Sequence, residues 1–393
     1  MNKKLLSIIA ILFTACILNA QTSSLTIGSD IQLPKDSIER SQLITDFNSF
    51  LLAVQQQVNI ENKWILPSEK LETEILIGEI KDINEKQKSD SSLKPHLNNA
   101  IPISKEQYLI QFSYLGTKEN IPYLQALFEI VATKINNTFQ FSSTLKRNTK
   151  DWKTETDNHL SIYYSSANKN FAEQYAKYIR EFDAKLKITK PTAFYFCEDC
   201  ETLSQLLQLS GIQYQQNSNG LSWIMTGYDT PDKNFDFFTK RFSDGQTVDP
   251  HDAFHSRASI AIPEKERNNS MICGCAYIYG GSWLISWTDI QKMFKAKMNY
   301  NKKTDWLKLY FDRYNFGESV ERHLLVTQFI NALIIQKVEK EQGFTAVMKL
   351  LASGNMFKDR TKFFKTLEEV TGINEKNFNK VVGNIIDKTM VKI

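Results

Sequence analysis

The sequence predicts an α+β protein built from two domains. Runs of apolar residues at helical spacing alternate with short apolar and aromatic runs that are typical of strands. The 393 residues exceed the size of one ordinary domain, and 42% hydrophobic with 12% aromatic residues suffice for sizeable cores. The net charge of +4 is spread without a basic block. No nucleic-acid partner is therefore predicted.

Residues 1–20 are predicted to be an export signal. Lys3 and Lys4 precede an apolar run at 5–18, and Asn-Ala-Gln at 19–21 is typical of a cleavage site. The run is too short for a stable membrane span, and no later run reaches that length. A second interpretation stays open, because the Phe-Thr-Ala-Cys segment ending at Cys16 is similar to a lipobox. The mature protein is then periplasmic or extracellular, or an outer-membrane lipoprotein attached through Cys16.

The first domain is predicted over residues 25–148. It combines one helix with several strands, which is an α+β plan and resembles the cone-shaped nuclear transport factor two-like domains. A helper or docking role is expected for it. The helix is predicted at 38–58, and apolar alternation predicts a strand at 73–80. A charged stretch at 81–98 predicts a loop. Further strands are predicted at 108–115, 127–135 and 138–145.

The second domain is predicted over residues 158–390, after a polar and charged stretch at 146–158. Its first part alternates short strands with amphipathic helices, which predicts a small mixed sheet. The predicted strands cover residues 160–164, 192–196 and 221–226, the predicted helices cover 171–186 and 203–209, and residues 235–242 are of mixed character.

A further helix is predicted to begin after Asp249, with that residue as N-cap and Pro250 as the first helical residue. Pro263 bounds this helix at its other end. The rest of the chain predicts a helical bundle. Amphipathic stretches lie at 321–340, 363–370 and 378–385, and Gly343, Gly354 and Gly372 punctuate the later helices.

The segment His-Asp-Ala-Phe-His at 251–255 is the most pointed chemical feature of the chain. Two of the five histidines, His251 and His255, stand four residues apart, so a helix places both imidazoles on one face. Asp252 follows the first histidine, at the position where zinc proteases keep a general base. The pattern predicts a metal site, with a helix that has lost its reaction as the alternative. In that alternative His255 and Asp252 bond neighbours such as Arg257, and His251 faces solvent.

Four cysteines outside the export signal form two tight pairs. Cys197 and Cys200 make a Cys-x-x-Cys, and Cys273 and Cys275 flank a glycine. In an oxidising compartment such pairs favour disulfides, and four cysteines allow three pairings. Free thiols and metal binding remain alternatives. Redox catalysis is not favoured, because no thioredoxin-like unit surrounds the pair.

Residues 158–390 resemble the gluzincin peptidases, zinc proteases with two histidines on one helix and a glutamate on a later helix. The sheet at 160–226 is similar to the family's upper sheet, and 251–255 stands where the family has His-Glu-x-x-His. Met-Ile-Cys-Gly-Cys-Ala-Tyr at 271–277 stands where the family shows Glu-Gly followed by alanine and an aromatic residue. The stretches 343–351 and 364–378 are similar to the closing helices of small bacterial gluzincin-like proteins.

The resemblance implies a zinc site held by His251, His255 and Cys273, with Asp252 as the base. Cysteine replaces the family's glutamate but can also ligate zinc. A rival alignment uses Gly280 and Gly281, which no acidic residue precedes. Asp252 is shorter than glutamate, and retraction of its carboxylate by about 1–1.5 Å would cost about a hundredfold in rate. An oxyanion donor is also needed, and the candidates are His323, Tyr277 and Tyr279.

Three functional hypotheses follow. The preferred hypothesis is a degenerate peptidase whose former cleft binds a peptide, an envelope protein or a glycan. The first alternative is an active zinc-dependent peptidase, and the second is a structural or assembly component of the cell envelope. The residues expected to line the cleft are Tyr277, Trp283, Trp287 and His323, although packing under the glycine turn at 280–281 also explains the two tryptophans.

Overall fold

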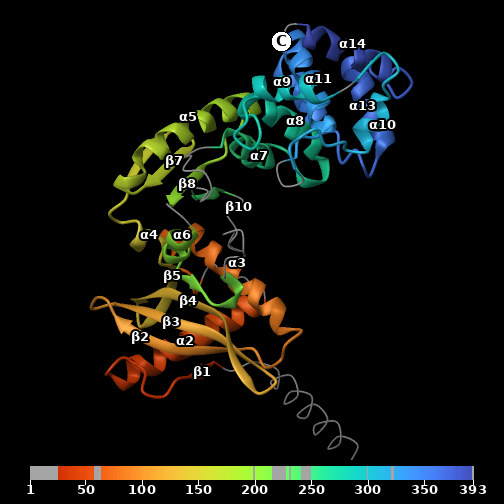
Figure 1. Ribbon diagram of the computed structural model, residues 1–393. Coiled ribbons are helices and arrows are strands. Elements are labelled where there is room, and N and C mark those ends of the chain that lie inside the picture. The colour runs from red at the N-terminus through yellow and green to blue at the C-terminus, as the bar shows by residue number, and fades with distance from the viewer. Residues whose placement is uncertain are drawn as a thin grey trace, which may run out of the picture. The chain divides into compact units, whose positions relative to one another are not determined.

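The structure is a computed structural model, and it describes residues 25–56, 63–197, 200–214, 227–229, 232–239, 249–298, 300–319 and 323–391 (Figure 1). The predicted α+β class is confirmed, because helices accompany two separate sheets. The export signal with Cys16 and the predicted strand at 221–226 lie outside the described residues. No helix of the described part combines the length and apolar character that crossing a bilayer requires.

The chain divides into two compact units, each made of two segments. The first consists of Met1–Ala167 and Thr192–Phe242, and the second of Asn168–Pro191 and Ser243–Ile393. The sequence predicts one change of domain, between residues 148 and 158. The chain instead passes from one compact unit to the other three times. It leaves the first unit for residues 168–191, which carry a helix, returns to it for 192–242, and then continues in the second unit from 243 onward.

The first unit contains a six-stranded sheet with two long helices against it (Figure 1). Its strands run antiparallel, except that β1 and β2 are parallel. The order is β1 (Thr26–Ile27), β2 (Lys94–Pro102), β3 (Gln107–Lys118), β4 (Ile121–Ile135) and β5 (Thr138–Ser143), with β9 (Leu209–Ser210) also paired to β4, and the helices are α2 (Ser37–Gln55) and α3 (Lys70–Gln87).

The core of this unit is aromatic where α2 meets the sheet. Phe47 packs edge-on against Phe112 at 5.1 Å between ring centroids, and Phe50 lies 4.9 Å from Phe141. All four side chains are fully buried. Edge-to-face and tilted contacts of this kind add stability beyond the burial of apolar area.

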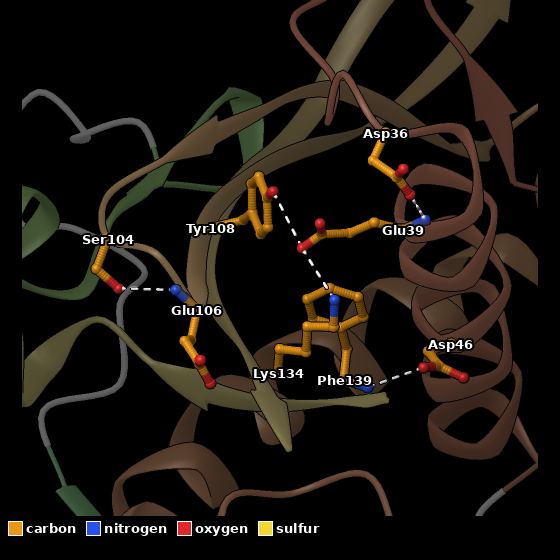
Figure 2. A network of polar contacts seen from close by, with 8 residues as sticks. All are labelled: Asp36, Glu39, Asp46, Ser104, Glu106, Tyr108, Lys134 and Phe139. Carbon is orange, nitrogen blue, oxygen red and sulfur yellow. Dashed lines mark hydrogen bonds and ion pairs between the residues drawn. The ribbon is translucent and has the colours of Figure 1, made fainter. Parts of the chain in front are cut away.

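Polar contacts then fix α2 against the sheet (Figure 2). Glu39 accepts a hydrogen bond from the Tyr108 hydroxyl at 3.2 Å and pairs with Lys134 at 3.6 Å. The buried Asp46 accepts from the backbone N–H of Phe139 at 2.8 Å. Asp36 caps the helix, accepting from the N–H of Glu39.

Two sequence predictions in this unit are wrong. Residues 73–80, predicted as a strand, lie within α3, and the predicted loop at 81–98 contains the end of α3 and the start of β2. The buried positions Thr73, Leu76, Ile77, Ile80 and Ile83 recur at helical spacing. Additional apolar residues between them add an alternation that is also typical of a strand.

A second, five-stranded sheet belongs to the first unit. It is mixed, since its three central strands are parallel and both outer strands are antiparallel to their neighbours. The predicted strands at 160–164 and 192–196 are confirmed. A further strand lies within the polar and charged stretch at 146–158. The order is β10 (Gly227–Asp229), β11 (Asn234–Thr239), β8 (Thr192–Cys197), β7 (Leu160–Tyr164) and β6 (Lys153–Asp157), and the short helices nearby in sequence are α4 (Leu145–Asn148) and α6 (Cys200–Leu207).

The described part of the second unit is helical. This confirms the predicted helices at 171–186 and in the last third of the chain. The helices are α5 (Lys169–Leu186), α7 (Pro250–Ala261), α8 (Asn269–Gly280), α9 (Trp287–Lys297), α10 (Trp306–Phe311), α11 (Val326–Gln342), α12 (Phe344–Leu351), α13 (Arg360–Thr371) and α14 (Phe378–Met390).

Local sequence signals set both ends of α7. The Asp249 side chain accepts from the N–H of His251 at 2.9 Å, and Pro250 is the first helical residue, as predicted. The helix ends at Ala261 because Ile262, which precedes Pro263, is extended.

A buried ion pair joins α7 to α5. Arg257 on α7 is fully buried and donates two hydrogen bonds to the Asp183 carboxylate, at 2.6 and 2.9 Å. The bidentate geometry fixes the rotation of α7 about its axis. His251 and His255 are carried on this helix.

Candidate metal centre

Two neighbouring helices bring the three predicted zinc ligands together. His251 and His255 lie one turn apart on α7, with 4.9 Å between ring centroids, and Cys273 lies on α8. The Cys273 Sγ atom is 3.3 Å from Nε2 of His255. One donor atom from each of the three residues lies within 4.8 Å of the other two, so all three can reach a single ion.

Glycines allow α8 to approach the helices on both sides. A Cβ atom at Gly280 would lie 2.2 Å from the backbone nitrogen of His251, and one at Gly274 would lie 2.6 Å from Cβ of Asn331 on α11. Neither distance is tolerated by a real side chain. The absence of Cβ atoms at Gly274 and Gly280 therefore permits the close packing that brings Cys273 next to the histidines.

A backbone carbonyl orients His251. The Nδ1 atom of His251 lies 2.6 Å from the carbonyl oxygen of Gly281, just beyond the end of α8. A carbonyl can only accept, so Nδ1 donates this hydrogen bond, which leaves Nε2 as the nitrogen that could ligate an ion. Histidine ligands to metals are commonly held in this way, by a hydrogen bond from the second ring nitrogen.

The metal-free pair of His255 and Cys273 is electrically neutral. Burial, assisted by the neighbouring His251, lowers the pKa of His255 to about 3. Burial raises the pKa of Cys273 to about 11. At neutral pH the pair is thus imidazole and thiol, with the Cys273 Sγ atom 3.3 Å from Nε2 of His255.

The donor chemistry of the three residues fits a metal ion. A metal ligand requires a neutral imidazole, and the lowered pKa of His255 keeps its ring neutral. Coordination by Cys273 requires its thiolate, which burial disfavours and which a bound cation would stabilise. Two imidazole nitrogens and one sulfur form a donor set that suits zinc.

The remaining motif residue, Asp252, is partly exposed on the first turn of α7. Burial is the main cause of the raised pKa of Cys273, and the charge of Asp252 raises it slightly further. In the alternative without a reaction, His255 and Asp252 bond neighbours such as Arg257, and the fully buried Arg257 donates two hydrogen bonds to Asp183. His251, however, is half-buried and bonded to Gly281 instead of facing solvent freely.

The predicted cleft residues divide into two groups. Tyr277 is buried with its ring 5.8 Å from that of His251, and Trp287 lies between Tyr277 and Phe329. Trp283 is 38% exposed and donates from Nε1 to the backbone carbonyl of His323 at 3.0 Å. Tyr277 and Trp287 therefore pack beside the candidate ligands, whereas Trp283 and His323 form a separate contact.

Tyr279, a candidate oxyanion donor, is committed elsewhere. Its hydroxyl donates to Glu339 at 2.6 Å, and its ring packs against Phe182 and Phe254. These contacts tie α8 to α11, α5 and α7. They give Tyr279 a packing role.

Gln328 is a site residue that the sequence analysis missed. It lies on α11 and accepts from the hydroxyl of Tyr277, whose ring contacts that of His251, at 2.6 Å. Its only sequence signal is an amide within the otherwise largely apolar stretch that begins α11. Such a signal does not say which helix the amide faces.

The cysteines are free thiols wherever the structure describes their side chains. Cys197, Cys273 and Cys275 form no disulfide, and Cys275 is fully buried beside Tyr279. The side chain of Cys200 lies outside the described residues. Cys273 is thus available as a metal ligand, and the glycine-flanking pair is not cross-linked.

Comparison with protein-family models gives no match to this chain, and comparison with curated proteins gives none either.

Proposed function

We propose that this chain is an exported, gluzincin-like zinc protein whose peptidase activity is lost or strongly reduced, and whose site binds a peptide or another envelope component. One observation carries the proposal: donor atoms of His251, His255 and Cys273 lie within 4.8 Å of one another on two packed helices. The export signal predicted at residues 1–20 supports a location outside the cytoplasm.

The state of each donor supports zinc as the ion. His255 is a neutral imidazole, His251 presents Nε2 because Gly281 binds Nδ1, and Cys273 supplies sulfur. Such mixed nitrogen and sulfur sets suit zinc better than calcium or magnesium, which prefer oxygen. Zinc held by these three residues would supply a Lewis acid able to polarise a carbonyl or carboxylate oxygen.

The residue at the base position supports binding in place of cleavage. Asp252 holds its carboxylate one methylene closer to the helix than the family's glutamate does. General-base transfer requires contact within about 3 Å of the water that is deprotonated. The shorter side chain withdraws the carboxylate from that contact, while the three ligand positions keep their geometry.

Zinc content tests the proposal directly. Mature protein purified from zinc-supplemented medium should carry about one equivalent of zinc by mass spectrometry of the metal, as a single three-ligand site requires. His255→Ala and Cys273→Ser should each lose it. Cys275→Ser removes a thiol from the same helix outside the candidate site, and His159→Ala removes an imidazole from the first unit; both should retain zinc.

Two results would contradict the proposal. If the wild-type protein stays free of zinc even after addition of the ion, the hypothesis of a structural or assembly role would remain. Hydrolysis of peptides by the zinc-loaded wild type, abolished by Asp252→Asn, would instead establish an active peptidase.

A further inference from the structure

A two-residue turn after α8 holds both of its residues in the left-handed region. Trp283 and Leu284 have φ angles of 53° and 64°. They connect Ser282 and Ile285, whose backbones exchange two hydrogen bonds, at 3.0 and 2.9 Å. A type I′ hairpin turn has this geometry, and it favours asparagine and glycine because other side chains are strained at positive φ. Two bulky apolar residues in these positions are therefore costly.

Two other turns of the described chain show which residues this backbone geometry ordinarily takes. Glu119 and Asn120 join β3 to β4, with φ angles of 53° and 63°. Asn136 and Asn137 join β4 to β5, with φ angles of 48° and 65°. Both turns are polar, and both use asparagine, which tolerates the left-handed region better than most side chains. The turn after α8 has the same backbone geometry without such residues, so local folding preference does not explain its sequence.

Burial does not explain the apolar pair either. Trp283 is 38% exposed and Leu284 is 41% exposed, so much of both side chains meets solvent. The indole is nevertheless held in place, because its Nε1 donates to the carbonyl of His323 at 3.0 Å and its ring lies edge-on to the His323 ring at 5.7 Å. A fixed aromatic side chain at the surface offers contact area at little entropic cost. Backbone strain of this kind is typical of functional sites.

The turn is connected to the candidate metal centre through Gly281. The carbonyl of Gly281 binds Nδ1 of His251 at 2.6 Å. Trp283 follows two residues later, so the Cα atoms of Gly281 and Trp283 lie within about 7 Å of each other. An extended peptide advances by about 3.3 Å per residue. A peptide bound at His251 can therefore place a neighbouring side chain on the turn.

The size and the charge of the turn distinguish between possible occupants. The exposed parts of Trp283 and Leu284 together offer on the order of 150 Å², about what one aromatic side chain buries. A stable protein–protein interface buries about 800 Å² on each partner, so this area fits one side chain and not a second copy of the chain. Residues 280–288 carry no charge, and residue 289 is an aspartate. The adjacent sequence thus supplies no positive charge to attract an anionic bilayer.

We propose that the Trp283–Leu284 turn is the specificity element of the candidate site, and that it binds one aromatic or aliphatic side chain of an extended peptide. The inference rests on the proposed function as a peptide-binding site and names the class of peptide. Asparagine and glycine would relieve the strain but would offer no apolar area. The strained pair is retained because this area contacts the ligand.

Replacing the pair with the residues that the turn favours separates binding from folding. Trp283→Asn combined with Leu284→Gly removes the exposed apolar area and relieves the strain. The urea midpoint of unfolding should stay unchanged or rise, whereas a purely structural role for the pair predicts a fall. Two controls are matched to this variant. Asn137→Gly relieves the turn between β4 and β5, and Ile121→Asn removes an apolar side chain of the first unit that is 67% exposed.

A positional-scanning library of N-acetylated hexapeptide amides is the probe for binding. The library is passed over immobilised mature protein, and bound peptides are quantified by mass spectrometry. The wild type should enrich phenylalanine, tryptophan, leucine or methionine at one peptide position, and the double variant should lose this enrichment. The affinity for the selected peptide, measured by fluorescence anisotropy, should fall by about 10- to 100-fold in the double variant and stay unchanged in both controls. Trp283→Phe keeps an aromatic ring and should retain the enrichment.

Running the same assay with and without added zinc separates this inference from the zinc function. If the protein carries no zinc but the turn still selects apolar peptides, the inference stands and the zinc site fails. Wild-type protein that selects no apolar position, with or without zinc, would overturn the inference. A double variant that binds the selected peptide as tightly as the wild type would do the same.

Two further measurements test the alternative roles of the turn. Should the double variant lose its fold, Leu284→Gly alone keeps the anchored indole, and it should weaken the selected peptide by about 3- to 10-fold at an unchanged urea midpoint. A lower midpoint with unchanged peptide affinity would assign the pair to folding and overturn the inference. Sedimentation with phosphatidylglycerol vesicles that depends on Trp283, without peptide selection, would overturn it in favour of a bilayer.

Discussion

At the scale of single residues, two features of the candidate centre bear on its chemistry. Donor atoms of the candidate ligands His251, His255 and Cys273 lie within reach of one ion, but the carboxylate beside them belongs to an aspartate, which is one methylene shorter than glutamate. Burial keeps His255 and Cys273 neutral, so a thiolate–imidazolium pair is disfavoured. Small substitutions can therefore test the proposed separation of binding from cleavage.

Lengthening Asp252 should recover hydrolysis. Asp252→Glu extends the carboxylate by about 1–1.5 Å toward the open coordination position, and a gain on the order of a hundredfold in peptidase rate is expected over a near-zero wild-type rate. Turnover of a fluorogenic peptide library by zinc-loaded protein measures this. Asp252→Asn is the control and should stay inactive. Equal inactivity of the glutamate variant would show that more than the base has been lost.

The lowered pKa of His255 predicts an acid-sensitive fold in metal-free protein. The folded state holds this imidazole neutral down to about pH 3, whereas the unfolded chain takes up a proton near its ordinary pKa of 6.5. Stability should thus be fully present above about pH 7 and decline as the pH falls through 6.5 toward 3. Urea unfolding of wild type and His255→Gln between pH 7.5 and about pH 5, above most carboxyl titrations, measures the difference. If the unfolding free energies of the two proteins change in parallel over this pH range, the prediction is contradicted.

At the scale of elements, glycines and an ion pair decide how the helices meet. Gly280 lies against the first turn of α7, Gly274 lies against α11, and Arg257 joins α7 to α5 through Asp183. None of these residues is a candidate ligand. Each nevertheless sets the position of a helix that carries one.

Gly280→Ala should damage the candidate centre without touching a ligand. Its Cβ atom would overlap the backbone nitrogen of His251 at 2.2 Å, so α7 and α8 must separate. At least a tenfold loss of zinc affinity is expected, since ligand convergence on this ion is sensitive to shifts of that size. Gly78→Ala is the control. It lies in α3 with open space around it and should stabilise the first unit by about 0.5–1 kcal/mol. Normal zinc binding by Gly280→Ala would refute this account of the helix contact.

Breaking the buried ion pair should be far more costly than breaking an exposed one. Asp183→Asn leaves the fully buried Arg257 without its carboxylate partner, and a loss of about 3–5 kcal/mol in unfolding free energy is expected. Asp312→Asn, which breaks an exposed pair with Lys308, should cost no more than about 0.5 kcal/mol. Denaturant titration compares them. Joint replacement by Asp183→Leu and Arg257→Met should recover much of the loss, because no charge then remains buried.

At the scale of the whole molecule, local signals were predictive and contacts between distant segments were not. The limits of α7 followed from Asp249, Pro250 and Pro263, because capping and proline effects act within a few residues. The misassigned α3 shows the limit of such patterns, since a densely apolar segment satisfies strand and helix periodicity together.

The candidate centre was predictable only in part for the same reason. The spacing of His251 and His255 implies a shared helix face, but Cys273 entered through family resemblance and Gln328 was missed. The pairing of Asp183 with Arg257 spans 74 positions, and no local pattern signals it. Packing of α8 against α7 and α11 is what brings these groups together.

The order of segments along the chain has a consequence for any attempt to isolate the helical part. Helix α5 is separated from α7 by the returning segment Thr192–Phe242, yet it supplies the carboxylate that neutralises Arg257. A fragment that begins at residue 243 would lack α5. It would therefore expose the side of α7 that packs against α5 and remove the Asp183 carboxylate from the Arg257 guanidinium. During synthesis, likewise, α5 must await more than sixty further residues before its partner leaves the ribosome.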